Sequence, residues 1–361
     1  MGILAAGGTG VAAPLEEPIR AALKQTIGAR EKVAGTVAVV FDESGTTTVA
    51  YGNTDVPDVA MDVDAVFEIG SITKVMTALL LADMVSRGEI AIDDPVSKYL
   101  PVKLHERGRA ITLQDLANYN SGLPKLPPNL PANWFINPNP FADYTAANFY
   151  GAVASYVPEY TPGSQFVYSS YGFALLGAAL ARRAGKSYET LLIERICDPL
   201  GLAHTRITPS SDMRNHLVRP HDVNLKPIQM WDFAPEMKGM GAVRSTAADM
   251  VLFVKACMGF VQTPLRGQLM RLTETRRTTN VLGTDAALGW FISSSGNDEI
   301  VWKTGLTAGC NTFIGFSTKT RRGTVVLSNF IWLPPDIGTT DMSMKLINEN
   351  FNPGDLAPLY Q

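Results

Sequence analysis

The positions of the strand-forming segments constrain the fold of this chain most, because these segments lie at its two ends. Near the start, residues 33–41 and 46–51 are rich in β-branched and apolar residues and flank a polar turn at 42–45. Four more segments of this kind lie toward the other end, at 287–293, 299–303, 311–317 and 323–330. Short turns join neighbouring strands into antiparallel pairs, so the pattern predicts one antiparallel sheet assembled from both ends of the chain.

The segment between these strands is predicted to be largely helical. Helix-forming stretches occur at 71–87, 112–118, 146–156, 171–184, 188–196 and 247–258. Two further helices are predicted near the termini, at 15–29 and 340–350, where they would flank the sheet. We therefore expect an α+β fold in which residues 14–70 and 240–361 form a sheet domain and residues 71–239 form an inserted, all-helical lobe. A cleft between the sheet and the lobe is the expected place for a site.

A proline-rich loop, residues 123–141, interrupts the helical lobe. Its sequence, LPKLPPNLPANWFINPNPF, contains too many prolines for a helix or an inner strand. Long loops without secondary structure are usually lids or disordered segments. The adjacent aromatic residues Trp134 and Phe135 favour a packed lid that shapes a substrate pocket.

The composition of the chain narrows the classes of partner. The chain has 361 residues, of which 46% are hydrophobic, and a formal net charge of −3 without a cluster of Lys and Arg. Proteins that bind nucleic acid need a basic surface, so we expect a small molecule or a peptide as the partner and no nucleic acid. The sequence leaves the oligomeric state open.

The compartment is also left open by the sequence. No apolar run reaches the roughly 18 residues that a membrane-spanning helix needs. The first 13 residues are rich in small residues and lack the basic segment that begins a secretory signal, so they are not a complete signal of this kind. They fit the trimmed end of such a signal, for a periplasmic or secreted protein, as well as a cytoplasmic start. The three cysteines, Cys197, Cys257 and Cys310, do not form a disulfide framework and are expected to be free thiols.

The segment Gly70-Ser71-Ile72-Thr73-Lys74 carries the first chemical motif. An apolar run follows it, so a helix is predicted to begin at Ser71, with Lys74 on the same face nearly one turn later. A serine hydroxyl is a poor nucleophile until a neighbouring base takes its proton. A lysine can be that base when burial and nearby cations lower its pKa. Because the helix is apolar nearly all round, we expect Lys74 to be buried.

A tyrosine and two serines, Tyr168-Ser169-Ser170, form the second motif, just before a predicted helix. A tyrosine near two cations can pass a proton between a nucleophile and a leaving group. Ser170 is expected to hydrogen bond Lys74 or a substrate amide.

The third motif, Lys303-Thr304-Gly305, ends a predicted strand. Lys303 and Thr304 offer a cation and a hydroxyl to a substrate carboxylate. Gly305 lets a substrate backbone approach closely, and the N–H of Leu306 can donate into an oxyanion hole.

Taken in order, Ser-x-x-Lys, Tyr-x-Ser and Lys-Thr-Gly resemble the motifs of the serine β-lactamase and penicillin-binding-protein superfamily. The resemblance is greatest to class C β-lactamases and their esterase and D-peptidase relatives, and it covers about residues 30 to 335. Supporting matches lie at Asp93-Asp94-Pro95-Val96, Ser121-Gly122-Leu123-Pro124 and Leu327-Ser328-Asn329. The resemblance implies a β-lactamase/transpeptidase-like fold and hydrolysis through an acyl-enzyme, without a cofactor or a metal.

The resemblance also implies a role for each matching residue. Ser71 would form the acyl-enzyme, and Lys74, Tyr168 and Lys303 would complete the catalytic set. The backbone N–H groups of Ser71 and Leu306 would form the oxyanion hole. The residues expected to bind substrate are Ser170, Thr304, Gly305, Leu306 and Asn329.

One position departs from the class C pattern. Ser170 stands where these enzymes usually have an asparagine that contacts the acylamino side chain of a β-lactam. In the other direction, esterases of this fold often lose the triplet that this chain keeps as Lys303-Thr304-Gly305. We therefore expect a serine hydrolase that cleaves an amide, either a β-lactam or a D-amino-acid peptide. The alternatives are a carboxylesterase of the same fold, which takes a small ester, and a slowly acylating penicillin-binding or sensor protein.

Other catalytic arrangements lack support in the sequence. The four histidines (His105, His204, His216 and His221) are not accompanied by a Gly-x-Ser-x-Gly elbow or by metal-ligand spacing. Glu68 and Glu159 are candidates for a deacylation base, but neither has a matching sequence context. We expect neither a Ser-His-Asp triad nor a metal centre.

Overall fold

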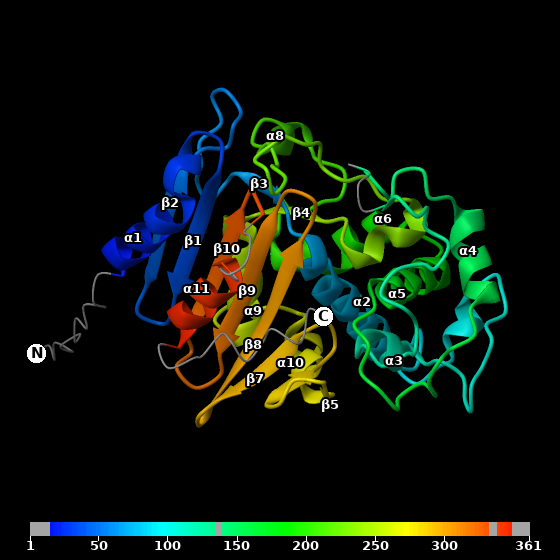
Figure 1. Cartoon of the computed structure of the whole chain (residues 1–361). Coiled ribbons are helices and arrows are strands. Elements are labelled where there is room, and N and C mark those ends of the chain that lie inside the picture. Colours follow the sequence, from blue (N-terminus) through cyan, green and yellow to red (C-terminus); the bar gives the residue numbers. More distant parts are fainter. Residues whose placement is uncertain (1–14, 135–136, 138, 332–337, 349–361) are drawn as a thin grey trace, which may run out of the picture.

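One antiparallel sheet is assembled from both ends of the chain, as predicted (Figure 1). The structure, a computed structural model, describes residues 15–134, 137, 139–331 and 338–348. The eight strands follow the order β2-β1-β10-β9-β8-β7-β6-β5. Their bounds are β1 Gly35–Phe41, β2 Thr46–Gly52, β5 Arg277–Thr278, β6 Thr284–Ala286, β7 Phe291–Ser295, β8 Asp298–Leu306, β9 Asn311–Ser317 and β10 Gly323–Ser328.

The N-terminal hairpin joins the sheet through β1, which pairs antiparallel with β10, with Val37 opposite Leu327. Every residue of β1 and of β10 is buried, because the sheet is covered on both faces at this point. Helices α1 (Glu16–Ile27) and α11 (Gly338–Ile347) lie on one face, and α9 (Ala247–Met258) lies on the other (Figure 1). The predicted arrangement of a sheet flanked by terminal helices is therefore confirmed.

The other helices agree with the predicted positions to within a few residues. They are α2 Thr73–Ser86, α3 Leu113–Ala117, α4 Ala146–Ser155, α5 Ser170–Ala184 and α6 Tyr188–Leu192. The short helices α7 Asp198–Leu200 and α8 Ser211–Arg214 were not predicted. A π-helical turn at Ile193–Cys197 continues α6. Most of them gather beside the sheet, on the right of Figure 1.

Several short elements were not predicted. Strands β5 and β6 hold two and three residues, and a separate pair, β3 (Val66–Glu68) and β4 (Arg244–Thr246), holds three residues each. Segments of this length show no periodicity, so only their tertiary partners make them strands. Helix α10 (Arg266–Glu274) was missed as well. It has two buried residues, Leu269 and Leu272, which is too few for a clear apolar stripe.

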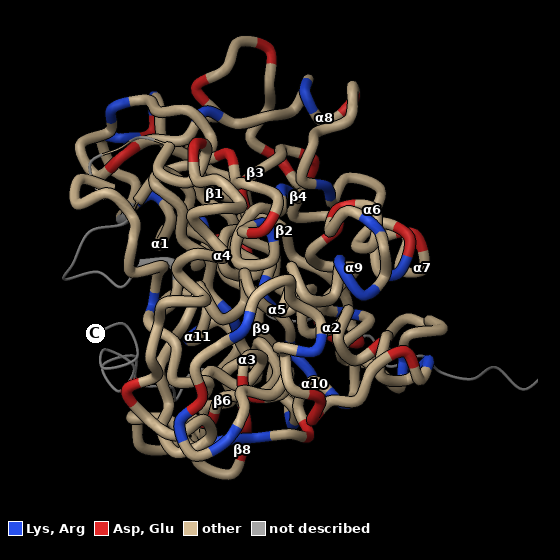
Figure 2. Tube along the Cα trace, turned by 90° about the vertical axis from the view of Figure 1, so that its right-hand side faces the viewer, with Lys and Arg blue, Asp and Glu red and all other residues tan. Residues whose placement is uncertain are grey.

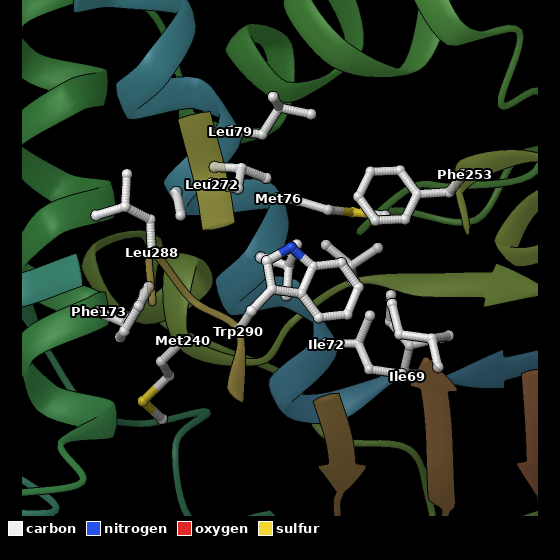
Figure 3. Close-up of a cluster of buried hydrophobic side chains, with 14 of the residues drawn as sticks. Ile69, Ile72, Met76, Leu79, Phe173, Met240, Phe253, Leu272, Leu288 and Trp290 are labelled. Atoms are coloured by element: carbon white, nitrogen blue, oxygen red, sulfur yellow. The ribbon is translucent and has the colours of Figure 1, made fainter. Parts of the chain in front are cut away.

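Helix α2 runs through the centre of the molecule. All of its residues from Thr73 to Met84 are buried, as its all-round apolar sequence predicts. Figure 3 shows Met76 of this helix among Phe253 of α9, Leu272 of α10 and Trp290, which precedes β7. The first turn of α2, which carries Lys74, is therefore held from several sides, and Ser71 lies in the turn directly before it.

No helix in the described part of the chain is both long enough and apolar enough to cross a membrane. All three cysteines are free, as expected.

Candidate active site

Ser71 lies in a tight turn between β3 and α2. Gly70 adopts a left-handed conformation (φ +49°), and the 3-10 turn Gly70–Ile72 leads directly into the helix. Lys74, nearly one turn later, is fully buried, and its Nζ donates a hydrogen bond to Ser71 Oγ at 2.8 Å. The same Nζ donates to the carbonyl oxygen of Met240 at 2.6 Å, which holds the amine against the serine.

The end of β8 packs directly on the Ser71 turn. A Cβ atom on Gly70 would lie 2.7 Å from Leu306 N, and one on Gly305 would lie 2.0 Å from Ile69 O. Both positions therefore require glycine. The close packing brings the backbone of Leu306 beside that of Ser71, as an oxyanion hole formed by their two N–H groups requires.

Tyr168 lies between the two lysines of the motifs. Lys303 on β8 is buried, and its Nζ donates to Tyr168 OH at 3.5 Å and to Thr304 O at 3.1 Å. The Nζ atoms of Lys74 and Lys303 lie 5.4 and 5.2 Å from the centre of the Tyr168 ring. The fold thus brings together the three motifs that are far apart in the sequence.

Burial changes the pKa of both lysines. Loss of water, with the charge of Lys303 as a second cause, lowers the pKa of Lys74 well below its ordinary value of 10.5. Burial lowers the pKa of Lys303 to about 7. A neutral amine has a lone pair, so the lowered pKa makes it easier for Lys74 to be the neutral acceptor of the Ser71 proton.

Aromatic residues that were not predicted enclose this group. The ring of Tyr119 stacks on Tyr168 at 4.9 Å between ring centres and on Phe291 at 5.6 Å. Tyr119 is fully buried, has φ +58° and donates from its hydroxyl to Gly289 O at 3.2 Å. Its sequence context carries no signal of this role. Phe291 offers a weak one, because it begins a strand whose neighbour, β8, carries Lys303.

The proline-rich loop supports the segment that carries Tyr168. The carbonyl oxygen of Pro124 accepts a hydrogen bond from Ser169 Oγ at 2.6 Å, and that of Lys125 accepts one from Ser170 N at 2.9 Å. Farther along the loop, the Phe141 ring stacks on Phe233. Of the aromatic pair expected to favour a lid, Trp134 is described, and Phe135 lies outside the described residues.

The predicted substrate-binding residues are found in different settings. Thr304 is half-buried beside Lys303, and Leu306 is 57% exposed at the end of β8. Ser170 begins α5 and is half-buried. The hydrogen bonds that Lys74 makes go to Ser71 and Met240 and not to Ser170.

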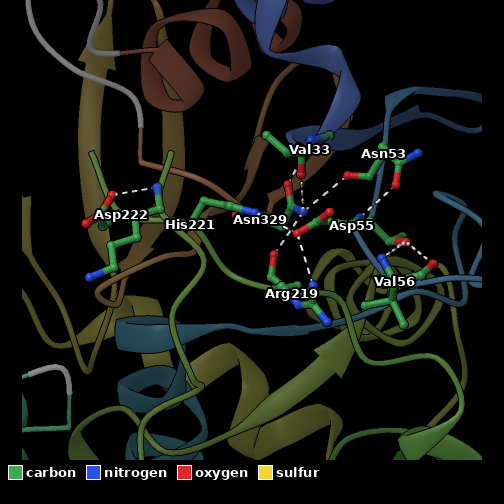
Figure 4. A network of polar contacts seen from close by, with 11 residues as sticks. Val33, Asn53, Asp55, Val56, Arg219, His221, Asp222 and Asn329 are labelled. Atoms are coloured by element: carbon green, nitrogen blue, oxygen red, sulfur yellow. Dashed lines mark hydrogen bonds and ion pairs between the residues drawn. The ribbon is translucent and has the colours of Figure 1, made fainter. Parts of the chain in front are cut away.

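Asn329 requires a correction, because its side chain is fully buried and is used inside the fold (Figure 4). Its Oδ1 accepts from Gly35 N at 2.7 Å. Its Nδ2 contacts the carbonyl oxygens of Val33, Asn53 and Arg219 at 3.1–3.2 Å. The amide has no group left to bind a substrate, so the prediction of a substrate contact is wrong.

The remaining ionisable candidates lie apart from the serine. Glu159 is exposed, and the Glu68 carboxylate contacts Trp231 and Thr307 instead of Ser71. His221 is buried against Asp55, with Nε2 3.1 Å from Oδ2. Within the part of the chain that the structure describes, no cluster of three or more His, Cys, Asp or Glu residues is arranged to hold a metal ion.

Comparison with known proteins agrees with this geometry. Residues 20–331 match the family described as Beta-lactamase. The D-alanyl-D-alanine-carboxypeptidase/endopeptidase AmpH of Escherichia coli K12 is 30% identical over 81% of this chain and 78% of its own length. A beta-lactamase of Pseudomonas fluorescens is 26% identical over 74% of this chain and 80% of its own length.

Solved structures show the same fold at lower sequence identity. A class C beta lactamase from Rhodobacter sphaeroides has a TM-score of 0.75 at 22% identity and covers 87% of this chain and 94% of its own. A beta-lactamase/D-alanine carboxypeptidase from Pseudomonas syringae has a TM-score of 0.79 at 18% identity, with coverages of 94% and 100%. The match over residues 20–331 shows that this chain belongs to the beta-lactamase family and is a serine hydrolase.

Proposed function

We propose that this chain hydrolyses the amide bond of a β-lactam or of a D-amino-acid peptide through an acyl-enzyme at Ser71. The observation that carries the proposal is the contact between Lys74 Nζ and Ser71 Oγ at 2.8 Å, with a lysine whose pKa is strongly lowered. Such a pair can activate the serine without a histidine.

The geometry supports a two-step reaction. In acylation, Ser71 Oγ bonds to the substrate carbonyl carbon while its proton passes to the neutral amine of Lys74. The backbone N–H groups of Ser71 and Leu306 donate to the carbonyl oxygen as it becomes negative. The proton then moves through Tyr168 to the leaving nitrogen as the amide bond breaks. In deacylation, water attacks the ester and Ser71 regains its proton.

The end of β8 favours a substrate that carries a carboxylate. Lys303 and Thr304 lie next to each other there, beside Gly305, and a cation with a neighbouring hydroxyl suits a carboxylate oxygen. β-Lactams and D-alanyl peptides both carry this group near the scissile amide. The names of the relatives, a D-alanyl-D-alanine carboxypeptidase and a beta-lactamase, support the same two substrates.

The charge distribution supports a small substrate over a nucleic acid. Figure 2 shows Lys and Arg interspersed with Asp and Glu over the described part of the chain, without an extended basic stripe in this view. The alternatives remain a carboxylesterase, because Ser170 replaces the usual asparagine, and a slowly acylating penicillin-binding or sensor protein.

The test is a panel of three substrates: nitrocefin, a D-Ala-D-Ala peptide and p-nitrophenyl butyrate. We expect steady hydrolysis of at least one of the two amides, and Ser71→Ala should lower kcat by about 10³-fold or more. Ser211→Ala, which removes an exposed serine on α8, should leave kcat unchanged. Full activity of Ser71→Ala on every hydrolysed substrate would end the proposal. Turnover of the butyrate alone would identify an esterase. A burst without steady turnover would identify a slowly acylating penicillin-binding or sensor protein.

A further inference from the structure

Glu68 is a buried carboxylate that the proposed mechanism does not use. It lies three residues before Ser71, at the end of β3, and is 4% exposed. A buried carboxylate is costly unless it is hydrogen bonded, so its partners indicate what it does. Its Oε1 accepts from the backbone N–H of Trp231 at 2.5 Å, and its Oε2 accepts from Thr307 Oγ1 at 2.8 Å.

Thr307 directly follows Leu306, whose N–H is assigned to the oxyanion hole. Thr307 N donates to Cys310 O at 3.0 Å, and Thr307 Oγ1 accepts from Cys310 N at 3.1 Å. The hydroxyl of Thr307 therefore closes the turn after β8 on one side and binds Glu68 on the other. Through this hydroxyl, the segment that carries Ser71 is connected to the segment that carries Leu306.

Arg244 contributes to the same arrangement. It lies opposite Glu68 in the register of β3 and β4, and its Nη2 donates to Trp231 O at 2.9 Å while Glu68 accepts from Trp231 N. Both backbone polar groups of Trp231 are thus held. Burial raises the pKa of Glu68 to about 7, with Asp232 adding to the rise; Arg244 and the hydrogen bonds from Thr307 and Trp231 lower it.

We propose that Glu68 is a positioning residue that holds the backbone N–H of Leu306 in the oxyanion hole by way of Thr307. The inference rests on the proposed acyl-enzyme reaction at Ser71. In this role Glu68 transfers no proton. Its carboxylate fixes the distance between two backbone segments, and that distance decides how well their N–H groups stabilise the transition state.

The test compares Thr307→Val, which removes the hydroxyl at nearly constant volume, with Thr307→Ser, which keeps it. Each variant is assayed for kcat and KM on the best substrate of the panel and for inhibition by phenylboronic acid. A boronic acid bonds to the active serine as a tetrahedral adduct, so its affinity reports the oxyanion hole. We expect Thr307→Val to lower kcat and boronate affinity together by about tenfold, with KM changed less than twofold. Thr307→Ser should restore both.

Thr284→Val is the matched control, because Thr284 is also buried and its hydroxyl is bonded to another side chain, Ser293 Oγ, at 2.9 Å on β6. It should lower thermal stability without changing boronate affinity. If Thr307→Val affects stability as this control does and keeps both kcat and boronate affinity, the positioning role is wrong.

Glu68→Gln separates positioning from proton transfer. A glutamine can accept from Trp231 N and donate to Thr307 Oγ1, so kcat should stay within about threefold of the wild-type value. A loss of about 100-fold or more, with unchanged boronate affinity, would make Glu68 a proton-transfer group and overturn the proposal. Failure of the proposed function is a separate result, because in that case Ser71→Ala would stay active and bind the boronate as the wild type does.

Discussion

Lys303 lowers the proton affinity of Lys74 because the fold buries both lysines around one tyrosine ring. The pKa of Lys74 is lowered by burial and also by the positive charge of Lys303. The three-residue spacing from Ser71 predicts that Lys74 can reach the serine, and the apolar helix predicts its burial. The contribution of Lys303, which comes from a distant strand, could be expected only from the resemblance to the superfamily.

Lys303→Met should move the acid side of the pH profile of kcat/KM to higher pH. Removing the positive neighbour raises the pKa of Lys74, so a larger fraction of the base is protonated at pH 7. On a substrate without a carboxylate, kcat/KM should therefore fall more at pH 7 than at pH 9. Lys226→Met, at an exposed lysine, is the control and should leave the profile in place. An unshifted profile in Lys303→Met would show that the two lysines are not coupled.

The same variant should change how stability depends on pH. The pKa of Lys303 is about 7 in the folded protein and near its ordinary 10.5 in the unfolded chain. Between pH 7 and the ordinary pKa of lysine, the unfolded chain binds a proton at Lys303 that the folded protein has largely released. The free energy of unfolding of the wild type therefore increases with pH in this range. Chemical denaturation at pH values from 7 to 10 should show a smaller increase in the free energy of unfolding for Lys303→Met than for the wild type.

At the scale of elements, the site depends on how closely the end of β8 packs on the turn before α2. Both elements were predicted from local patterns, whereas their contact was expected only from the resemblance to the superfamily. It exists because Gly70 and Gly305 have no side chains, and because Thr312 Oγ1 on β9 contacts both Ile69 O and Gly305 O, at 3.1 and 3.3 Å. A glycine in a sequence motif indicates that another segment packs closely against it, but it does not identify that segment.

Gly70→Ala should abolish most activity. The new Cβ would lie 2.7 Å from Leu306 N, and alanine is strained in the left-handed backbone conformation of this position, so the two sides of the proposed oxyanion hole must separate. We expect kcat to fall by about 10²-fold or more. Gly88→Ala is the matched control, since Gly88 has φ +68° with open space around it. It should cost about 1 kcal/mol of stability and no activity, and an equal loss of kcat in both variants would contradict the role of the contact.

At the scale of the whole molecule, a single cluster of buried apolar residues includes Val39 of β1, Met76 of α2 and Phe149 of α4. We still propose the division into residues 14–70 with 240–361 and residues 71–239, as a division of strand-rich from helical segments. Because the two parts share this cluster, we expect them to support each other's stability. Asn329 adds a polar connection, joining the end of β10 to the backbone around β1 and to Arg219.

Asn329→Ala should therefore destabilise the protein without changing substrate affinity. It leaves the buried N–H of Gly35 and several carbonyl groups without this partner, which should lower the free energy of unfolding by about 2–4 kcal/mol. Chemical denaturation measures this loss, and KM of the folded variant should stay within about twofold. Asn224→Ala, at an exposed asparagine, is the control. A raised KM with unchanged stability would return Asn329 to the substrate site.

Local sequence patterns are enough to recognise the longer helices and strands and the chemistry that each can offer. Runs of β-branched residues, an apolar helix and the spacing of Ser71 and Lys74 depend on neighbours within a few residues, so they can be recognised in the chain. The tertiary structure decided how these groups are used: the stacking of Tyr119 on Tyr168, the internal role of Asn329 and the contact of Glu68 with Thr307. These depend on burial and on the orientation of distant segments. Residues far apart in the chain set both, and no local pattern records them.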